Sequence, residues 1–189
     1  MKLKQGQILL FDGHDRHFSG RSIHAIQKKR GFSDEAARWI HVAGVGKDCD
    51  LIDPYPPEIR IRSLQKEYID KGYDIAVLTM KDSTAFRDMA RARAFETMLG
   101  NAYNILELVW FILPRWWRKI GSIDFPGEIC SEFAARALKI TGELPLLTDK
   151  NPDQVFPAEF FNEDIFDIKI YSFKNYGNTE NMLTFCPVF

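Results

Sequence analysis

The chain of 189 residues has few cysteines, and nothing in their arrangement suggests that they work together. The three are Cys49, Cys130 and Cys186, an odd number without a CxxC motif or a Cys/His cluster. This pattern predicts neither a disulfide framework nor a metal site, and it favours a reducing compartment. We therefore expect a protein that needs no metal or other cofactor.

The sequence also lacks an excess of either charge and a long hydrophobic run. Lys and Arg total 25 against 26 Asp and Glu, so the clustered positive charge of a general nucleic-acid binder is absent. The longest apolar stretch, 105–113, contains Glu107 and is far shorter than the roughly 20 residues that span a bilayer. The N-terminus lacks the cleavage site of a secretory signal. We expect a cytoplasmic protein, or one delivered without a signal peptide, for example by a phage.

Aromatic residues are plentiful, at 13% of the chain, and they extend from Phe11 to Phe189. With 46% hydrophobic residues and no internal repeat, the composition is that of one globular domain over residues 1–189. Apolar periodicity and turn signals predict a mixed α+β fold. The expected strands cover residues 6–11, 38–46, 49–53, 59–61, 73–80 and an apolar run at 166–173. The expected helices run from Ser22 to before Gly31, from Asp82-Ser83 to Gly100 with Phe86, Met89 and Phe95 on the apolar side, over 102–113, and over 128–142. Pro54, Pro56 and Pro57 are expected to end regular structure after the third strand.

Cys130 lies near the start of the helix that follows Pro126-Gly127. Unpaired backbone N–H groups and the helix dipole favour a thiolate there, and the same N–H groups suit a developing oxyanion. This position is therefore typical of a nucleophile. The alternative interpretation is a small apolar residue that packs beneath a helix.

His41 is the candidate base, because a thiol nucleophile needs an imidazole held in a fixed place. It lies in the alternating stretch WIHVA, where its parity matches Trp39 and Ala43 and opposes Val42. The alternative is a hydrogen-bonded strand histidine without a catalytic role. The three other histidines are expected to be exposed, in a glycine-flanked loop or on a short basic helix.

Asp53 is the candidate third group, at the end of the strand that follows His41. If residues 38–46 and 49–53 pair through the turn between them, this carboxylate can reach the imidazole. Asp53 could instead cap the turn before Pro54. Asp48 and Asp50 are rival candidates closer to the turn.

Five segments in their order along the chain resemble a known family. GQILLF, SIHAIQKK, WIHVAGV, LID and EICSEFAARAL look like the permuted branch of the NlpC-type papain-like cysteine hydrolases, in its YiiX/YaeF-like group. In that branch the histidine strand precedes the cysteine helix. The resemblance covers residues 6 to about 157. It implies a circularly permuted papain-like fold, in which a small antiparallel sheet or partial barrel packs against helices that include the nucleophile helix.

The resemblance also implies roles for single residues. Cys130 takes the nucleophile position, His41 the base and Asp53 the third polar position, where relatives often carry Glu. Tyr103 resembles the family's tyrosine near the substrate, and Ser131 continues its C-S-E motif next to the nucleophile. The family usually opens with Gly-Asp, whereas this chain has Gly6-Gln7.

These features predict a thiol hydrolase that cleaves an amide bond in a peptide or peptidoglycan-type substrate. Two alternatives stay open: a lipid-directed acyltransferase or esterase on the same fold, and a papain-like module that binds or supports without catalysis. The segment ELVWFILPRWWRKIG favours the first alternative if Trp116 and Trp117 contact a membrane surface. The other interpretation of this segment is an aromatic core element with outward-facing cations.

Overall fold

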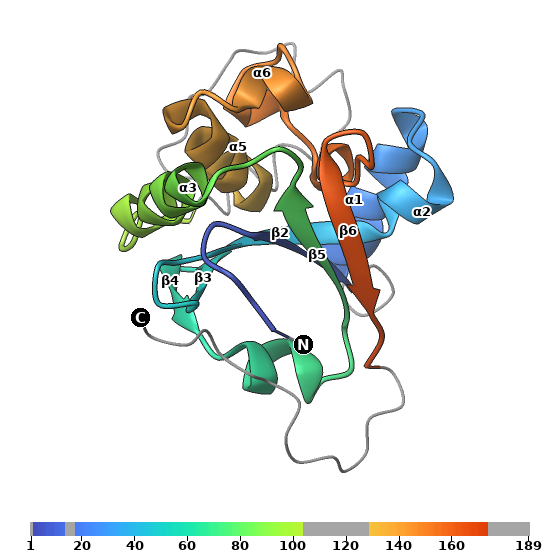
Figure 1. Cartoon of the computed structure of the whole chain (residues 1–189). Helices are drawn as coiled ribbons and strands as arrows, with labels where there is room; N and C mark the ends of the chain where they lie inside the picture. The colour runs from blue at the N-terminus through green and yellow to red at the C-terminus, as the bar shows by residue number, and fades with distance from the viewer. Residues whose placement is uncertain (1, 14–17, 104–128, 174–189) are drawn as a thin grey trace.

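A computed structural model describes residues 2–13, 18–103 and 129–173, and its centre is one antiparallel sheet of six strands (Figure 1). The order across the sheet is β4-β3-β2-β1-β5-β6. The strands are β1 (Ile8–Asp12), β2 (Trp39–Val45), β3 (Leu51–Tyr55), β4 (Glu58–Arg62), β5 (Asp74–Met80) and β6 (Phe166–Tyr171). With helices packed on this sheet, the predicted α+β class is confirmed.

The strand β1 is buried along its whole length because it lies between β2 and β5. Its alternate residues belong to two separate cores: Ile8 and Leu10 face the helix side, while Leu9 and Phe11 face the core that includes Tyr68. A strand covered on both faces needs a continuous apolar sequence, which explains the run ILLF.

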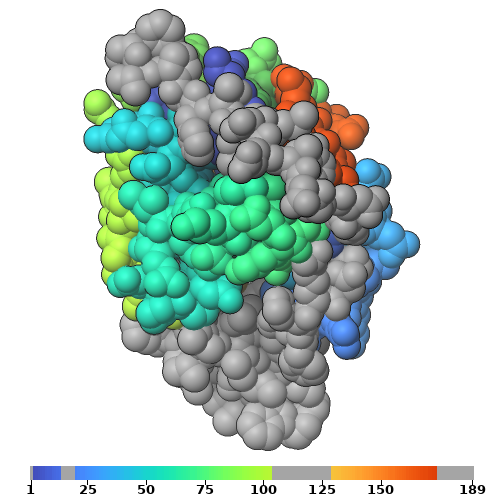
Figure 2. Space-filling view, turned by 90° about the horizontal axis from the view of Figure 1, so that it is seen from below, coloured from blue at the N-terminus to red at the C-terminus, as the bar shows by residue number. Residues whose placement is uncertain are grey.

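Eight helical segments accompany the sheet in the described part of the chain. They are α1 (Phe18–Lys29), α2 (Asp34–Ala37), α3 (Ala85–Thr97), α5 (Cys130–Ile140), α6 (Leu144–Leu147), the π-helix η1 (Gln65–Ile69) and the 3-10 helices η3 (Pro152–Gln154) and η4 (Pro157–Phe160). In Figure 1, α3, α5 and α6 lie together on one side of the sheet. From below, β4 and η1 form the middle of the visible surface (Figure 2), and Tyr68 and Ile69 of η1 are buried beneath it.

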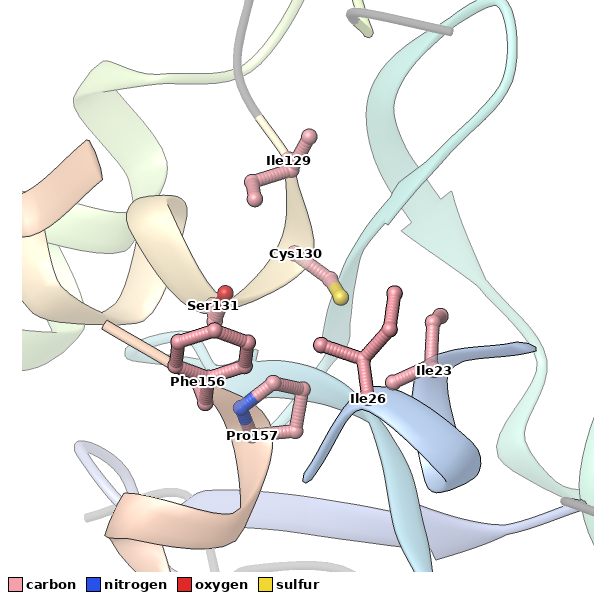
Figure 3. Close-up of a pocket in the computed structure, with 7 residues that line it drawn as sticks. All are labelled: Ile23, Ile26, Ile129, Cys130, Ser131, Phe156 and Pro157. Carbon is pink, nitrogen blue, oxygen red and sulfur yellow. The ribbon is translucent and has the colours of Figure 1, made fainter. Parts of the chain in front are cut away.

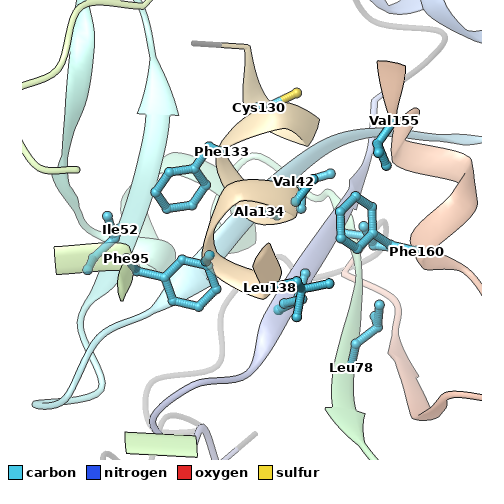
Figure 4. Packing of buried hydrophobic residues seen from close by; sticks show 14 of the residues in the cluster. Val42, Ile52, Leu78, Phe95, Cys130, Phe133, Ala134, Leu138, Val155 and Phe160 are labelled. Atoms are coloured by element: carbon cyan, nitrogen blue, oxygen red, sulfur yellow. The ribbon is translucent and has the colours of Figure 1, made fainter. Parts of the chain in front are cut away.

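The helix α5 carries the largest apolar contact with the sheet. Phe133, Ala134, Ala137 and Leu138 are fully buried, and they meet residues of β2, β3 and α3 in the helix-side core (Figure 4). Phe133 stacks on Phe95 of α3 with ring centroids 5.1 Å apart. This packing holds the first residue of the helix, Cys130, at a constant place relative to β2.

Two expectations about strands are wrong in detail. β3 does not stop before the prolines: it continues through Pro54, which pairs with Ile59 of β4. A proline is tolerated there because β2 pairs with β3 only as far as Ile52, so no strand on that edge needs the missing N–H. Cys49 lies outside β3, in the turn before it, with a left-handed backbone (φ 61°).

A bulge in β2 corrects the predicted parity of His41. Phe11 is opposite His41, but Asp12 is opposite Trp39, so one extra residue, Ile40, enters the strand. Trp39 therefore packs in the helix-side core together with Val42, whereas His41 shares its side with Phe11 and Ala43. The expected match of His41 with Ala43 is right, and the match with Trp39 is wrong.

The helix α3 also differs from expectation. It is capped by Thr84, whose side chain accepts a hydrogen bond from the N–H of Arg87, and not by Asp82-Ser83. Phe86 is 73% exposed, so it does not belong to the apolar face, which is formed by Ala92, Ala94 and Phe95. The charged Arg91 takes a buried position on this helix instead.

Some expectations fall on residues outside the described ranges: most of the helix predicted over 102–113, Trp116 and Trp117, and Cys186. Cys49 itself is disulfide-bonded, so the expectation that the cysteines do not work together is wrong for this residue. A disulfide also removes the argument from cysteine usage for a reducing compartment. Among the described residues, no helix has both the length and the apolar character needed to cross a membrane.

Candidate active site

Cys130 is the first residue of α5 and is 95% buried. The preceding residue, Ile129, has an extended backbone and provides no side-chain cap, so no side chain at the N-cap position satisfies the N–H groups of the first turn. Unlike Cys49, Cys130 is not in a disulfide. The thiol therefore stands at the positive end of an eleven-residue helix that the core holds in place.

His41 and Asp53 meet side by side from neighbouring strands. Nε2 of His41 lies 2.6 Å from Oδ1 of Asp53, and the two side chains are 16% and 0% exposed. The pairing of Val45 with Leu51 sets this register between β2 and β3. The rival carboxylates, Asp48 and Asp50, are both exposed near the turn.

Asp53 is oriented by two further side chains that the sequence did not single out. Tyr68 donates its hydroxyl hydrogen to Oδ2 at 2.6 Å, and Nη1 of Arg62 donates to the same oxygen at 3.0 Å. Arg62 is in turn held by Glu67, with 2.6 Å between Nη2 and Oε2. Both oxygens of Asp53 are thus engaged by side chains, which argues against a role in capping the proline turn. The sequence EIRIR could have indicated Arg62 as a partner, because it places cations on the strand next to a buried carboxylate.

The side chain of Cys130 lies close enough to the imidazole of His41 to raise the pKa of the ring. Because Nε2 faces Asp53, Nδ1 is the ring nitrogen left for the sulfur. Cys130, His41 and Asp53 therefore form one connected series, in which the carboxylate fixes the ring and the ring faces the thiol. This is the arrangement in which an imidazole activates a nucleophile.

The charges around His41 favour its protonated form. Burial lowers the pKa of His41, but the negative charges at Asp53 and Cys130, with their hydrogen bonds, outweigh burial and raise it from 6.5 to about 10. For Asp53, burial raises the pKa, yet His41, Tyr68 and Arg62 bring it below the ordinary value. Burial together with the carboxylate of Asp53 raises the pKa of Tyr68 well above 10, so this side chain stays a hydrogen-bond donor.

A small cavity opens beside the sulfur of Cys130 (Figure 3). Ser131, which is buried, lines it together with Cys130. Tyr103 is elsewhere: its N–H donates to the carbonyl of Pro57 beside the β3–β4 turn, and it is not among the described residues that line the cavity. In the described ranges no cluster of three or more His, Cys, Asp or Glu side chains is arranged to hold a metal ion.

No family model matches the chain, and no curated protein matches it either. The resemblance noted in the sequence therefore depends on the motifs and their order alone.

The protonation of His41 is a testable property of this site. We expect its ring to stay protonated through pH 8, because its pKa of about 10 lies well above that range. Asp53→Asn should bring the pKa below 6.5, since burial then acts against a weaker opposing charge. NMR titration of the ring measures the pKa of His41 in wild type and in Asp53→Asn. Asp50→Asn is the matched control, because Asp50 is exposed. A titration midpoint near pH 6.5 for the wild-type His41 ring would contradict its coupling to Asp53 and Cys130.

The same shift has a consequence for stability. Since the folded pKa of His41 lies above its unfolded value of 6.5, the protonated ring stabilises the folded state fully below about pH 6.5. That contribution is lost as the pH rises through about 10.

Proposed function

We propose that the protein is a cysteine hydrolase that cleaves an amide bond through a Cys130 acyl-enzyme. The observation that carries the proposal is a single imidazole, that of His41, which contacts Asp53 through Nε2 at 2.6 Å and lies beside Cys130 at the start of α5. A buried cysteine that served only for packing would need neither partner. The substrate is a small peptide or a related amide.

In the proposed reaction, the Cys130 sulfur attacks the carbonyl carbon, and the carbonyl oxygen becomes an oxyanion. The backbone N–H of Cys130 at the helix start stabilises that charge. When the C–N bond breaks, the amine leaves with the proton of His41. Water then attacks the thioester and gives a proton back to His41, and the acid is released from the sulfur. Asp53 holds the ring throughout and balances its positive charge.

The choice of acyl acceptor separates this function from its alternative. Water as the acceptor makes the protein a peptidase or amidase, whereas an amine or alcohol makes it an acyltransferase. An acyl lipid as substrate belongs to the second possibility, and the residues that would support membrane contact, Trp116 and Trp117, lie outside the described ranges. We therefore keep the amide hydrolase as the proposal.

A thiol-directed electrophile tests the proposal without knowledge of the substrate. Wild-type protein is treated with an N-substituted chloroacetamide at pH 6.5 under non-reducing conditions, and the modified peptides are mapped by mass spectrometry. We expect rapid alkylation at Cys130, because the imidazole of His41 lies beside the sulfur and can act as its base. His41→Ala should slow this alkylation at least about tenfold, since that base is then lost.

The controls for this experiment are two. Cys130→Ala should lose the modification at that peptide, and circular dichroism should show that both variants are folded. Equal alkylation rates for wild type and His41→Ala would show that the histidine does not activate the thiol, and would favour the interpretation as a module without catalysis.

A further inference from the structure

The cavity beside Cys130 is lined almost entirely by hydrocarbon. α1 contributes one wall and the segment that leads into η4 the other, with the start of α5 between them (Figure 3). The described lining residues are Ile23, Ile26, Ile129, Cys130, Ser131, Phe156 and Pro157. Apart from Cys130, none of these residues has an ionisable side chain, and the sulfur of Cys130 points toward Ile26.

The position of His41 decides which part of a substrate enters this cavity. His41 must deliver its proton to the leaving amine, so the leaving group has to lie on the imidazole side of the sulfur. His41 is not among the described residues that line the cavity, although it lies beside Cys130. A group inside the cavity is therefore on the other side of the carbonyl carbon, which is the acyl side.

The walls of the cavity are held by one buried amide. Gln27, which is fully buried in α1, donates to the carbonyls of Ala37 at 2.9 Å and Trp39 at 3.0 Å. It also accepts from the N–H of Ala158 in η4 at 2.8 Å. These three bonds tie α1 to β2 and to η4, so the two walls keep their separation.

We propose that this cavity binds a small aliphatic group on the acyl side of the bond that Cys130 attacks. The inference rests on the proposed function and adds the chemical class of the substrate to it. Burial of hydrocarbon against Ile23, Ile26 and Phe156 supplies the affinity, and a charged group would lose its hydration without a partner. The cavity is small, about 20 Å³ in volume, so it takes a short aliphatic group and excludes a long chain.

Two kinds of substrate carry such a group. One is a short-chain acyl amide or ester, and the other is a peptide whose residue before the scissile bond is valine or leucine. A panel with one fluorogenic amine as leaving group separates them. Its acyl parts are acetyl, propionyl, butyryl, hexanoyl, decanoyl and succinyl in one arm, and N-acetylated glycine, valine, leucine and aspartate in the other.

We expect kcat/KM to rise about fourfold for each methylene group from acetyl to butyryl, because each buried CH₂ contributes about that factor. Decanoyl and the charged succinyl and aspartyl members should be poor substrates. In the peptide arm, valine or leucine should exceed glycine by at least about tenfold if a side chain is the natural occupant. Equal kcat/KM values across the acyl series would overturn the inference for a short-chain acyl substrate. Equal values across the amino-acid series would overturn it for a peptide substrate.

Substitution of Ile26 shows whether this cavity sets the preference. Ile26→Ala enlarges the cavity and should move the best chain to a longer one, whereas Ile26→Trp should move it to acetyl. Ile140→Ala is the matched control, since Ile140 is 64% exposed at the far end of α5. If kcat/KM depends on acyl chain length in the same way in wild type and in both Ile26 variants, the inference is wrong.

A reagent series keeps this test independent of turnover. 1-Chloro-2-alkanones carry the same alkyl groups on a ketone whose chloromethyl carbon alkylates the sulfur of Cys130, with loss of chloride. If no amide is cleaved while the alkylation rate at Cys130 still peaks at a short alkyl chain and shifts with Ile26, the proposed hydrolase fails and the cavity assignment stands. If amides are cleaved without a chain preference, the proposed hydrolase stands and the cavity assignment fails.

Discussion

Cys130→Ala is expected to lower turnover of the best fluorogenic amide by about 10⁴-fold to 10⁶-fold. The loss is this large because the substitution removes the atom that forms the covalent intermediate, and only binding and oxyanion stabilisation are left. His41→Ala should cost nearly as much, since the thiol then has no base and the leaving amine no proton. The measurement is kcat/KM for both single variants and for the double variant.

The double variant gives the sharper comparison. Cys130 and His41 act together on the same bond in the proposed mechanism, so we expect the double variant to be no slower than either single one. Multiplied losses would mean that the two residues act separately. Residual activity of Cys130→Ala within tenfold of wild type would remove Cys130 from the mechanism.

Asp53 is expected to contribute less than the other two. Asp53→Asn keeps the shape of the side chain but removes the charge that holds the imidazolium, so we expect a loss of about 10²-fold to 10⁴-fold. Tyr68 and Arg62 keep the replacement side chain in place through the hydrogen bonds that they donate to Oδ2. Asp50→Asn is the matched control, because Asp50 is exposed, and it should leave kcat/KM unchanged.

Arg91→Met is expected to lower the free energy of unfolding by about 3–5 kcal/mol. Arg91 is 2% exposed, and its Nη1 lies 2.6 Å from Oε2 of Glu143, which is 1% exposed. Its Nε donates to the carbonyl of Gly6 at 2.6 Å, which connects α3 to the segment before β1. Removal of the cation leaves the Glu143 carboxylate buried without its counter-charge, which explains the large cost.

Urea denaturation at pH 7 measures this effect. Arg93→Met is the matched control on the same helix, since Arg93 is exposed, and it should change the free energy of unfolding by less than about 0.5 kcal/mol. The double variant Arg91→Met/Glu143→Leu should recover most of the loss, because it buries no charge. A single variant as stable as wild type, or a double variant no more stable than the single one, would contradict this account.

Several parts of the site could be predicted because neighbouring residues encode them. The alternation in WIHVA and the turn at Gly46–Asp48 predict two adjacent strands, and their pairing brings Asp53 within reach of His41. The apolar spacing after Cys130 predicts a helix, and a helix start is where a thiolate is favoured.

Other parts could not be predicted because they depend on where distant segments pack. The partners of Asp53 come from β4 and η1, and no local pattern shows that a tyrosine and an arginine will share one of its oxygens. The burial of Arg91 against Glu143, 52 positions later in the chain, overrides the usual preference of arginine for the surface.

The sequence by itself determined the α+β class, most of the strands and the helix of Cys130, because periodicity, turns and caps are properties of adjacent residues. It also limited the candidate nucleophile, base and carboxylate to a few side chains. Only the tertiary structure decided that Cys130, His41 and Asp53 meet, that Pro54 stays within a strand, and that the cavity beside the sulfur is apolar. The physical reason is that contacts between segments depend on the free energy of the whole packing, which no window of adjacent residues contains.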